Sequence, residues 1–144
     1  MAQTVLRSPE PVLFRTELAV RVGDLNYGNH LANDAVLRLV HEARVRWLAA
    51  GGFSETDVLG VGLIMNRAEV HYLAQAFFGD VLRIDCGIAA WSRTGFVFRA
   101  ALLRQSDGKT VALADCSMVF FDYAKQKVAR MPQGFQAWAE KTVG

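Results

Sequence analysis

One stretch of this chain has the spacing of a long amphipathic helix. The apolar residues that recur there at intervals of three and four are Val36, Val40, Ala43 and Trp47. Residues with this spacing share one helical face, and the Gly-Gly pair at 51–52 ends the pattern. A face of this size has to be buried, so the rest of the chain must supply a second layer.

The rest of the chain has the apolar alternation of β-strands. The five strand-like segments are Val12 to Val22, Leu63 to Tyr72, Val81 to Trp91, Gly95 to Gln105 and Thr110 to Tyr123. Turn sequences such as Gly79-Asp80 and Ser106-Asp107-Gly108-Lys109 link the last four segments, and such short links favour antiparallel hairpins. We therefore expect an α+β fold, in which a five-stranded antiparallel sheet wraps around the helix.

Three other segments complete the prediction. Residues 1–11 contain Pro9 and Pro11, which favour a loose lead-in. The segment from Phe53 to Gly62 reads as an irregular connection. The segment from Gln133 to Lys141 follows Pro132 and indicates a terminal helix on the outside of the domain.

Composition limits the class of protein. The 144 residues carry 16 Lys and Arg against 14 Asp and Glu, a net charge of +2, without the basic runs of a nucleic-acid-binding protein. We expect one domain over residues 1–144. The first residues lack the apolar core of a signal peptide, and no stretch is long enough to cross a membrane, so we expect a cytoplasmic protein. Cys86 and Cys116 lie in strand-like segments and are expected to be buried free thiols.

The densest polar cluster lies directly before the helix. It comprises Asp24, Asn26, Asn29, His30, Asn33 and Asp34. Asn29 or Asn33 can serve as the N-cap, and Asp34 suits the positive end of the helix dipole. The free N–H groups of a first helical turn can bind an anion or a developing oxyanion. The cluster therefore predicts a functional site at the helix start.

Three segments in order resemble the hotdog-fold acyl-CoA thioesterases of the 4-hydroxybenzoyl-CoA thioesterase type. The segments are GDLNYGNHLAN at 23–33 with EAR at 42–44, EVHYLAQAFFGDVLRI at 69–84, and WSRTGFVFRAAL at 91–102. The resemblance covers most of the chain. It implies the hotdog fold, hydrolysis of an acyl-CoA thioester, and an assembly of paired sheets. It also implies that the backbone N–H near Asn33 faces the thioester oxygen.

The chain departs from the family pattern at the usual catalytic carboxylate, because Asn26 stands in its place. An amide cannot act as nucleophile or base at neutral pH. Asp34 is our first candidate for the missing base, Glu42 the second and Asp24 the third, while Asn26 could orient the carbonyl or a water. His30 fits a hydrogen-bonding role in the loop better than the role of base. Asp34 could equally be a solvated helix-dipole partner, and Glu42 an ion-pair partner on the helix face.

Two alternative functions remain open from the sequence. A hydratase or dehydratase would need an Asp/His pair, and a non-catalytic acyl-CoA binding protein would need no base. No cofactor is expected beyond coenzyme A as part of the substrate. A metal site from His30, Asp34 and His41 lacks a recognised spacing. Trp91, Arg93 and Thr94 form the best candidate cluster for binding coenzyme A, although an exposed turn explains them equally well.

The last strand predicts self-association. Its two faces are both apolar, with Val111, Leu113, Val119 and Phe121 on one and Ala112, Ala114, Met118 and Phe120 on the other. The helix covers only one face of a sheet. We therefore expect a homodimer or homotetramer.

Overall fold

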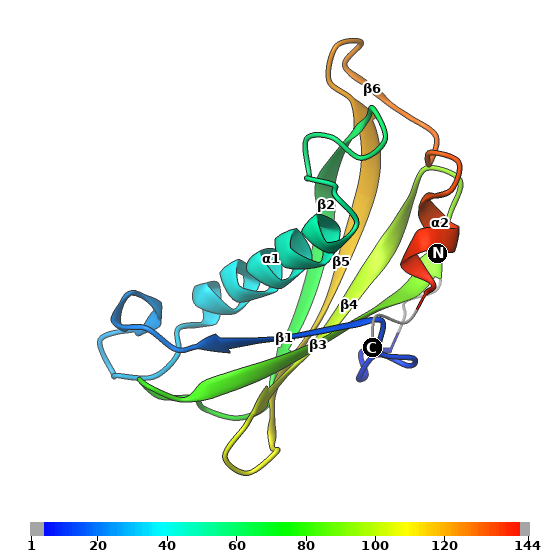
Figure 1. Cartoon of the computed structure of the whole chain (residues 1–144). Coiled ribbons are helices and arrows are strands. Elements are labelled where there is room, and N and C mark those ends of the chain that lie inside the picture. The colour runs from blue at the N-terminus through cyan, green and yellow to red at the C-terminus, as the bar shows by residue number, and fades with distance from the viewer. Residues whose placement is uncertain (1–4, 142–144) are drawn as a thin grey trace.

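The computed structural model describes residues 5–141. It shows one curved antiparallel sheet around a single long helix, α1 (Asn33–Ala50) (Figure 1). The strands are β1 (Phe14–Ala19), β2 (Gly62–Tyr72), β3 (Val81–Trp91), β4 (Gly95–Arg104), β5 (Thr110–Asp122) and the short β6 (Lys127–Val128). The sheet order is β1-β3-β4-β5-β2, and β6 pairs with β5. The predicted α+β hotdog architecture is confirmed, with β6 as a sixth strand that was not expected.

The predicted helical stripe is the face that α1 buries. Val40 and Ala43 have no exposed surface, and Val36 and Trp47 are 2% exposed. The Trp47 ring contacts the rings of Phe96 and Phe98 on β4. Burying this apolar stripe against the sheet is the main favourable term that holds the two layers together.

The C-terminal helix α2 (Phe135–Ala139) is not on the outside as predicted. Phe135 is fully buried, and its ring packs against Trp47 of α1 and Phe120 of β5. The Trp138 ring also contacts Trp47, at 5.3 Å between the ring centroids, so two aromatic side chains draw this short helix onto the open end of the core. Figure 1 shows α2 beside the upper part of the sheet.

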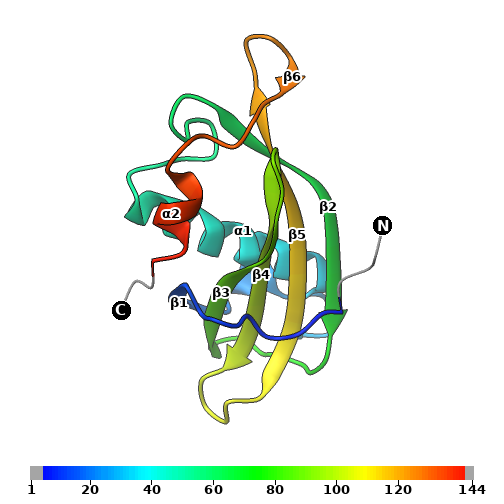
Figure 2. The same cartoon turned by 90° about the vertical axis from the view of Figure 1, so that its right-hand side faces the viewer.

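The N-terminal segment is also more ordered than expected. From residue 5 it crosses the face of the sheet that α1 does not cover (Figure 2). Leu6 is buried there, and an Arg99 Nη2–H group donates to the Val5 carbonyl at 3.0 Å. Pro9 and Pro11 lie so close to Gly87 that a Cβ on this glycine would clash with them. Residues 5–11 have no helix or strand, as predicted, but the expectation that they are loose was wrong, and residues 1–4 lie outside the described part.

The connection between α1 and β2 has no regular structure, as predicted. The Glu55 carboxylate holds it to α1 by accepting from Nε of the buried Arg44 at 2.7 Å. Cys86 and Cys116 are buried free thiols, which confirms that prediction. Within residues 5–141, no helix combines the length and the apolar character needed to cross a membrane.

Candidate functional site

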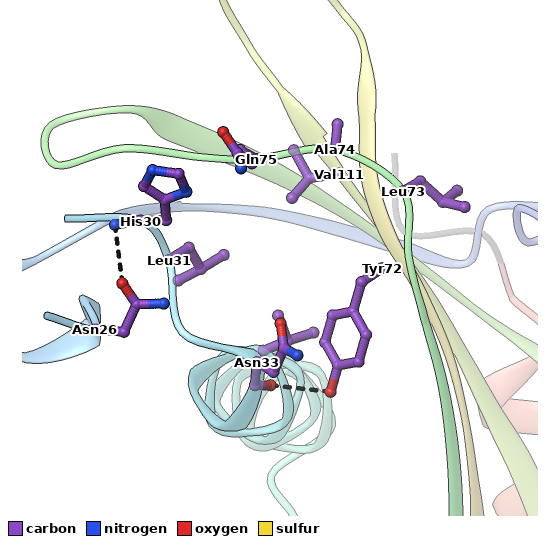
Figure 3. A pocket seen from close by; sticks show the side chains of 10 residues that line it. Asn26, His30, Leu31, Asn33, Tyr72, Leu73, Ala74, Gln75 and Val111 are labelled. Atoms are coloured by element: carbon purple, nitrogen blue, oxygen red, sulfur yellow. Dashed lines mark hydrogen bonds between the residues drawn. The ribbon is translucent and has the colours of Figure 1, made fainter. Parts of the chain in front are cut away.

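A pocket of about 370 Å³ opens where α1 begins. The polar cluster before the helix forms one side of it, and the end of β2 with the loop that follows forms the other (Figure 3). The polar residues that line it are Asn26, His30, Asn33, Tyr72 and Gln75. The predicted site at the helix start therefore coincides with a pocket, and three of the predicted site residues meet in it.

The Asn26 side chain organises the loop before α1. Its Oδ1 accepts from the backbone N–H of Gly28 at 2.9 Å and of His30 at 3.3 Å. The Asn26 N–H also donates to the His30 carbonyl at 2.9 Å. These two hydrogen bonds fix the Asn26 Oδ1 atom on the loop side, and the Nδ2 atom of the same amide therefore faces the start of α1 (Figure 3). Asn26 thus presents a hydrogen-bond donor to the pocket, where a carboxylate would present an acceptor.

The helix start has no side-chain cap, contrary to the prediction of Asn29 or Asn33. The N-cap is Ala32, and Asn33 is already the first helical residue. The loop sets the cap position, because the Ala32 N–H donates to the Asp24 carbonyl at 2.9 Å. Within the described residues, the backbone N–H groups of Asn33 and Asp34 have no hydrogen-bond acceptor. These two donors, aligned with the helix dipole, are available to a ligand oxygen.

Contacts with the segment after β2 fix the loop in space. The Leu31 N–H donates to the Ala76 carbonyl at 2.8 Å. The His30 ring meets the Phe77 ring edge-on, with 5.2 Å between the ring centroids. Asp24 lies beneath the loop, 3% exposed, and accepts from the Arg21 N–H at 2.9 Å. Asp24 therefore holds the loop and does not line the pocket.

The sequence did not identify two polar residues of the pocket. The Tyr72 hydroxyl donates to the Asn33 carbonyl at 3.1 Å, which joins the end of β2 to the first residue of α1. Gln75 lines the pocket, and its side-chain amide has no partner among the described residues. Tyr72 and the preceding His71 are both exposed at the end of β2. Both residues lie in the segment 69–84 that resembles the thioesterase family, and this resemblance was the sequence feature that could have indicated them.

The two predicted carboxylates lie outside the pocket lining of their own chain. The Asp34 side chain is 79% exposed and lies 3.2 Å from the Arg38 guanidinium. Glu42 accepts from Arg46 at 2.7 Å, and Arg46 also binds Thr16 on β1. Glu42 therefore has the ion-pair partner that the sequence allowed for it, whereas Asp34, expected as a solvated partner of the helix dipole, is exposed and also pairs with Arg38.

The residues proposed for coenzyme A lie around the turn between β3 and β4. Trp91 is half-buried and contacts the Phe96 and Phe135 rings, so only part of it can serve as an outer surface. Arg93 is exposed, and Thr94 accepts through its carbonyl from the Phe120 N–H at 2.8 Å. This turn does not border the pocket at the start of α1.

The pocket has the groups to bind and polarise a carbonyl oxygen. Among the lining residues, Asn33 offers a free backbone N–H group and Asn26 an amide, and the free N–H group of Asp34 is the next one along the helix. Among the described residues that line it, none is a carboxylic acid, and His30 is the lining residue best suited to accept a proton near neutral pH. Within residues 5–141 no group of three or more His, Cys, Asp or Glu is placed to hold a metal ion.

Comparisons with known proteins agree with this architecture. Residues 20–139 match the family model of the thioesterase-like superfamily. A 1,4-dihydroxy-2-naphthoyl-CoA thioesterase from Synechocystis is similar in structure, with a TM-score of 0.78 and 23% identity over 86% of this chain and 93% of that one. A protein of the thioesterase superfamily from Jannaschia sp. CCS1 has a TM-score of 0.79 and 22% identity, over 90% of this chain and 82% of that one.

A third similar structure is that of a Staphylococcus aureus protein in complex with CoA. Its TM-score is 0.78 and its identity 16%, over 95% of this chain and 84% of that one. The curated proteins gave no match. The family model spans most of the chain, including the pocket and the whole sheet from β2 to β5. The chain therefore belongs to the thioesterase-like superfamily.

Proposed function

We propose that the protein hydrolyses an acyl-CoA thioester to the free acid and coenzyme A. The observation that carries this proposal is the pair of unpaired N–H groups of Asn33 and Asp34 beside the pocket. The thioester oxygen would accept from this pair, so the charge that develops during attack by water would be stabilised by fixed dipoles. The Asn26 amide would add a third donor or position the water.

The base that activates the water belongs to the same proposal. His30 is favoured by its position in the pocket, and its backbone is fixed by the Asn26 side chain. Asp34 remains the carboxylate candidate, but it would have to leave Arg38 and turn toward the pocket. In either case the base takes a proton from water, and the water oxygen bonds to the carbonyl carbon while the N–H pair holds the oxyanion. The C–S bond then breaks, and the protonated base returns its proton to the coenzyme A thiolate, which leaves as the thiol.

We also propose that the protein works as a homodimer or homotetramer. β2 is at the end of the sheet order, and within residues 5–141 it pairs only with β5, so no other described strand pairs with its second edge. The strand is 11 residues long and exposes Met65 and Tyr72. A second copy is a natural partner for a long, partly apolar edge. The two apolar faces of β5 first suggested self-association. The N-terminal segment of the same chain already covers part of the outer face of the sheet, so the edge of β2 is the stronger basis for this proposal.

Support for coenzyme A as the carrier comes from the comparisons. One similar structure is that of a thioesterase named for a CoA ester, and another contains CoA. Arg93, with Trp91 and Thr94 beside it, remains our proposed contact for the nucleotide end. Arginine pairs with phosphate through several hydrogen bonds in a fixed geometry.

The decisive test is thiol release from a panel of short, long and aromatic acyl-CoAs. Release faster than in buffer for at least one of them is expected. Loss of the ultraviolet absorbance of an enoyl-CoA without thiol release would favour a hydratase. Tight binding of acyl-CoA without either reaction would favour a binding protein and exclude the hydrolytic proposal.

A further inference from the structure

The chain between β2 and β3 crosses the ends of two other strands without forming a strand of its own. We call residues 73–80 the crossing segment. Because β5 and β4 lie between β2 and β3 in the sheet order, this segment passes the ends of both (Figure 1). Its first residues, 73–75, line the pocket at the start of α1. The shape of one pocket wall therefore depends on the contacts that hold the crossing segment.

Backbone hydrogen bonds hold the crossing segment on either side of Gln75. Before it, the N–H groups of residues 73–74 donate to the Val111 carbonyl of β5, at 2.8 and 3.1 Å. After it, the Ala76 carbonyl accepts from the Leu31 N–H of the loop before α1, at 2.8 Å. Gln75 lies between these two anchors, and a side chain holds its carbonyl.

That side chain belongs to Arg104, the last residue of β4. Its Nη1–H group donates to the Gln75 carbonyl at 2.6 Å. Arg104 stands opposite Leu82 of β3, whose side chain is fully buried in the core with α1. Because directly opposite residues share one face of a sheet, the arginine lies on the helix face. Arg104 therefore reaches the crossing segment from the face on which the pocket opens.

The turn between β4 and β5 fixes the Arg104 guanidinium. Asp107 of this turn accepts from Nε at 3.1 Å and from Nη2 at 2.7 Å, one bond to each carboxylate oxygen. This paired geometry leaves Nη1 for Gln75. The bonds from Arg104 and from the Lys109 N–H lower the pKa of Asp107 to about 2, so the carboxylate stays charged near neutral pH. Arg104 is therefore oriented by its own hairpin.

The position of the Gln75 carbonyl affects two parts of the site. Gln75 itself lines the pocket, as does His30 (Figure 3). The next two residues hold the loop before α1, since Ala76 accepts from the Leu31 N–H and the Phe77 ring contacts the His30 ring. A shift of this carbonyl would move the wall and the loop together. Misplacement by about 1 Å far from the chemistry can lower a rate by about 10²-fold.

We propose that Arg104 is a positioning residue for the reaction: by fixing the Gln75 carbonyl, it sets the shape of the pocket wall and so determines which acyl groups fit. This inference rests on the proposed thioesterase function. Arg104 is not among the residues that line the pocket, so it acts on the acyl group through Gln75. Without this donor the wall relaxes, and the acyl group that matches the present shape loses the most.

Arg104→Gln tests this role with the panel of acyl-CoAs. The variant removes a charged hydrogen bond, so KM should rise about tenfold for the acyl-CoA that the wild type hydrolyses best. kcat should fall less. The advantage of that acyl-CoA over the poorer ones in kcat/KM should narrow by a similar factor. A loss of folded protein would reduce turnover of all acyl-CoAs alike, so an unchanged ratio across the panel would overturn the proposal.

Arg99 offers a matched control on the outer face of the sheet. It makes two bonds to the Asp115 carboxylate, both at 2.9 Å, and donates to the Val5 carbonyl at 3.0 Å. Arg99→Gln should lower stability at least as much and keep both KM and the acyl preference. Arg99→Lys takes its place if the glutamine variant does not fold. Equal narrowing of the acyl preference in the Arg99 and Arg104 variants would overturn the proposal.

Asp107→Asn tests the contact that orients the guanidinium. It leaves Arg104 in place and weakens the pairing, so KM should rise in the same direction by a smaller factor. The double variant with Arg104→Gln should be no worse than Arg104→Gln alone, because both changes act on one contact with Gln75. Fully additive effects on KM would overturn the sequence of contacts from Asp107 to Gln75.

Hydrogen exchange of the Leu31 amide reports the same positioning without any need for hydrolysis. Its N–H donates to the Ala76 carbonyl, so its exchange should become about tenfold faster in Arg104→Gln relative to the strand amides, and not in Arg99→Gln. If no acyl-CoA is hydrolysed but exchange changes as described, the proposed function fails and the control of the wall by Arg104 stands. Faster exchange with an unchanged acyl preference would show that Arg104 only stabilises the structure, and would overturn its role in the reaction.

Discussion

The Tyr72 hydroxyl donates to the Asn33 carbonyl at 3.1 Å and so joins the last residue of β2 to the first residue of α1. The Asn33 carbonyl faces down the helix, while its N–H is one of the two free donors beside the pocket. A change at Tyr72 should therefore affect the placement of these donors as well as stability.

We expect Tyr72→Phe to cost about 0.5–1.5 kcal/mol in the free energy of unfolding and to lower kcat more than KM. The chain offers a matched control, because the Tyr123 hydroxyl donates to the Leu63 carbonyl at 3.2 Å near the other end of β2. Tyr123→Phe should lose similar stability and keep its kcat. Urea unfolding and thiol release measure both variants. An equal effect on kcat in the two would show that Tyr72 acts only through general stability.

Much of this fold was predictable because its signals are local. The limits of β3 were predicted without error, and those of β4 and β5 to within one residue at their ends. The apolar stripe that includes Val36 and Trp47 predicted that the helix packs against the sheet as a second layer. Periodicity reports which face of an element is buried, and turn residues report where it ends.

The errors concern contacts between distant parts of the chain. Tyr72 and Asn33 are 39 residues apart, and nothing in either neighbourhood indicates that they meet. Leu6 is a single apolar residue without a periodic context, and Phe135 shares helical spacing only with Trp138 and Ala139, so neither pattern indicates which part of the core the residue contacts. The cap at Ala32 depends on a loop held by Ala76, which local capping rules do not include.

The identity of the base can be decided with two amide substitutions. If His30 deprotonates the water, His30→Gln should lower kcat by about 10²–10⁴ and leave folding intact. If Asp34 does so, Asp34→Asn should have that effect instead. Otherwise Asp34→Asn should cost only about 0.3–1 kcal/mol of stability through the helix dipole.

Glu42→Gln is the control for these two variants. It removes the Arg46 partner at 2.7 Å on the side of α1 that faces β1, so turnover should persist. A collapse of kcat in Glu42→Gln, with near-normal turnover in both other variants, would transfer the role of base to Glu42.

The proposed assembly predicts a mass above that of one chain. Light scattering at micromolar concentration should give at least twice 15.9 kDa. Ala68→Pro places a proline in the exposed part of β2, where it would also disturb the pairing with β5, so circular dichroism must first show that the fold is kept. A wild-type mass near 15.9 kDa would contradict the proposed assembly.

The two cysteines predict a dependence of stability on alkaline pH. Burial raises the pKa of both Cys86 and Cys116. In the unfolded chain these thiols ionise near their ordinary pKa of about 8.5, whereas in the folded chain they stay protonated to higher pH. The unfolded state therefore binds fewer protons above that pH, and stability should fall as pH rises through this range.

Thiol labelling checks the same property directly. With a thiol reagent at pH 8, the folded protein should react far more slowly than a free thiol, and denaturant should release both groups. Rapid labelling of either cysteine in the native protein would show that it is accessible. Slow labelling has a practical consequence, because the protein's own thiols would add little background to an assay of thiol release.

The last prediction concerns Asn26, whose Oδ1 accepts from two backbone N–H groups while its amide nitrogen faces the start of α1. Asn26→Asp should preserve the loop, since a carboxylate oxygen can accept both bonds, and it would place an anionic oxygen where the amide nitrogen now lies. That oxygen can act as a base or nucleophile, so the variant should restore turnover to a chain whose own base has been removed by His30→Gln or Asp34→Asn. Asn26→Ala is the companion variant, because it removes the loop bonds without supplying a base. Rescue by Asp with loss in Ala would place the reacting carbonyl beside residue 26, whereas equal loss of turnover in both variants would show that residue 26 acts only by shaping the loop.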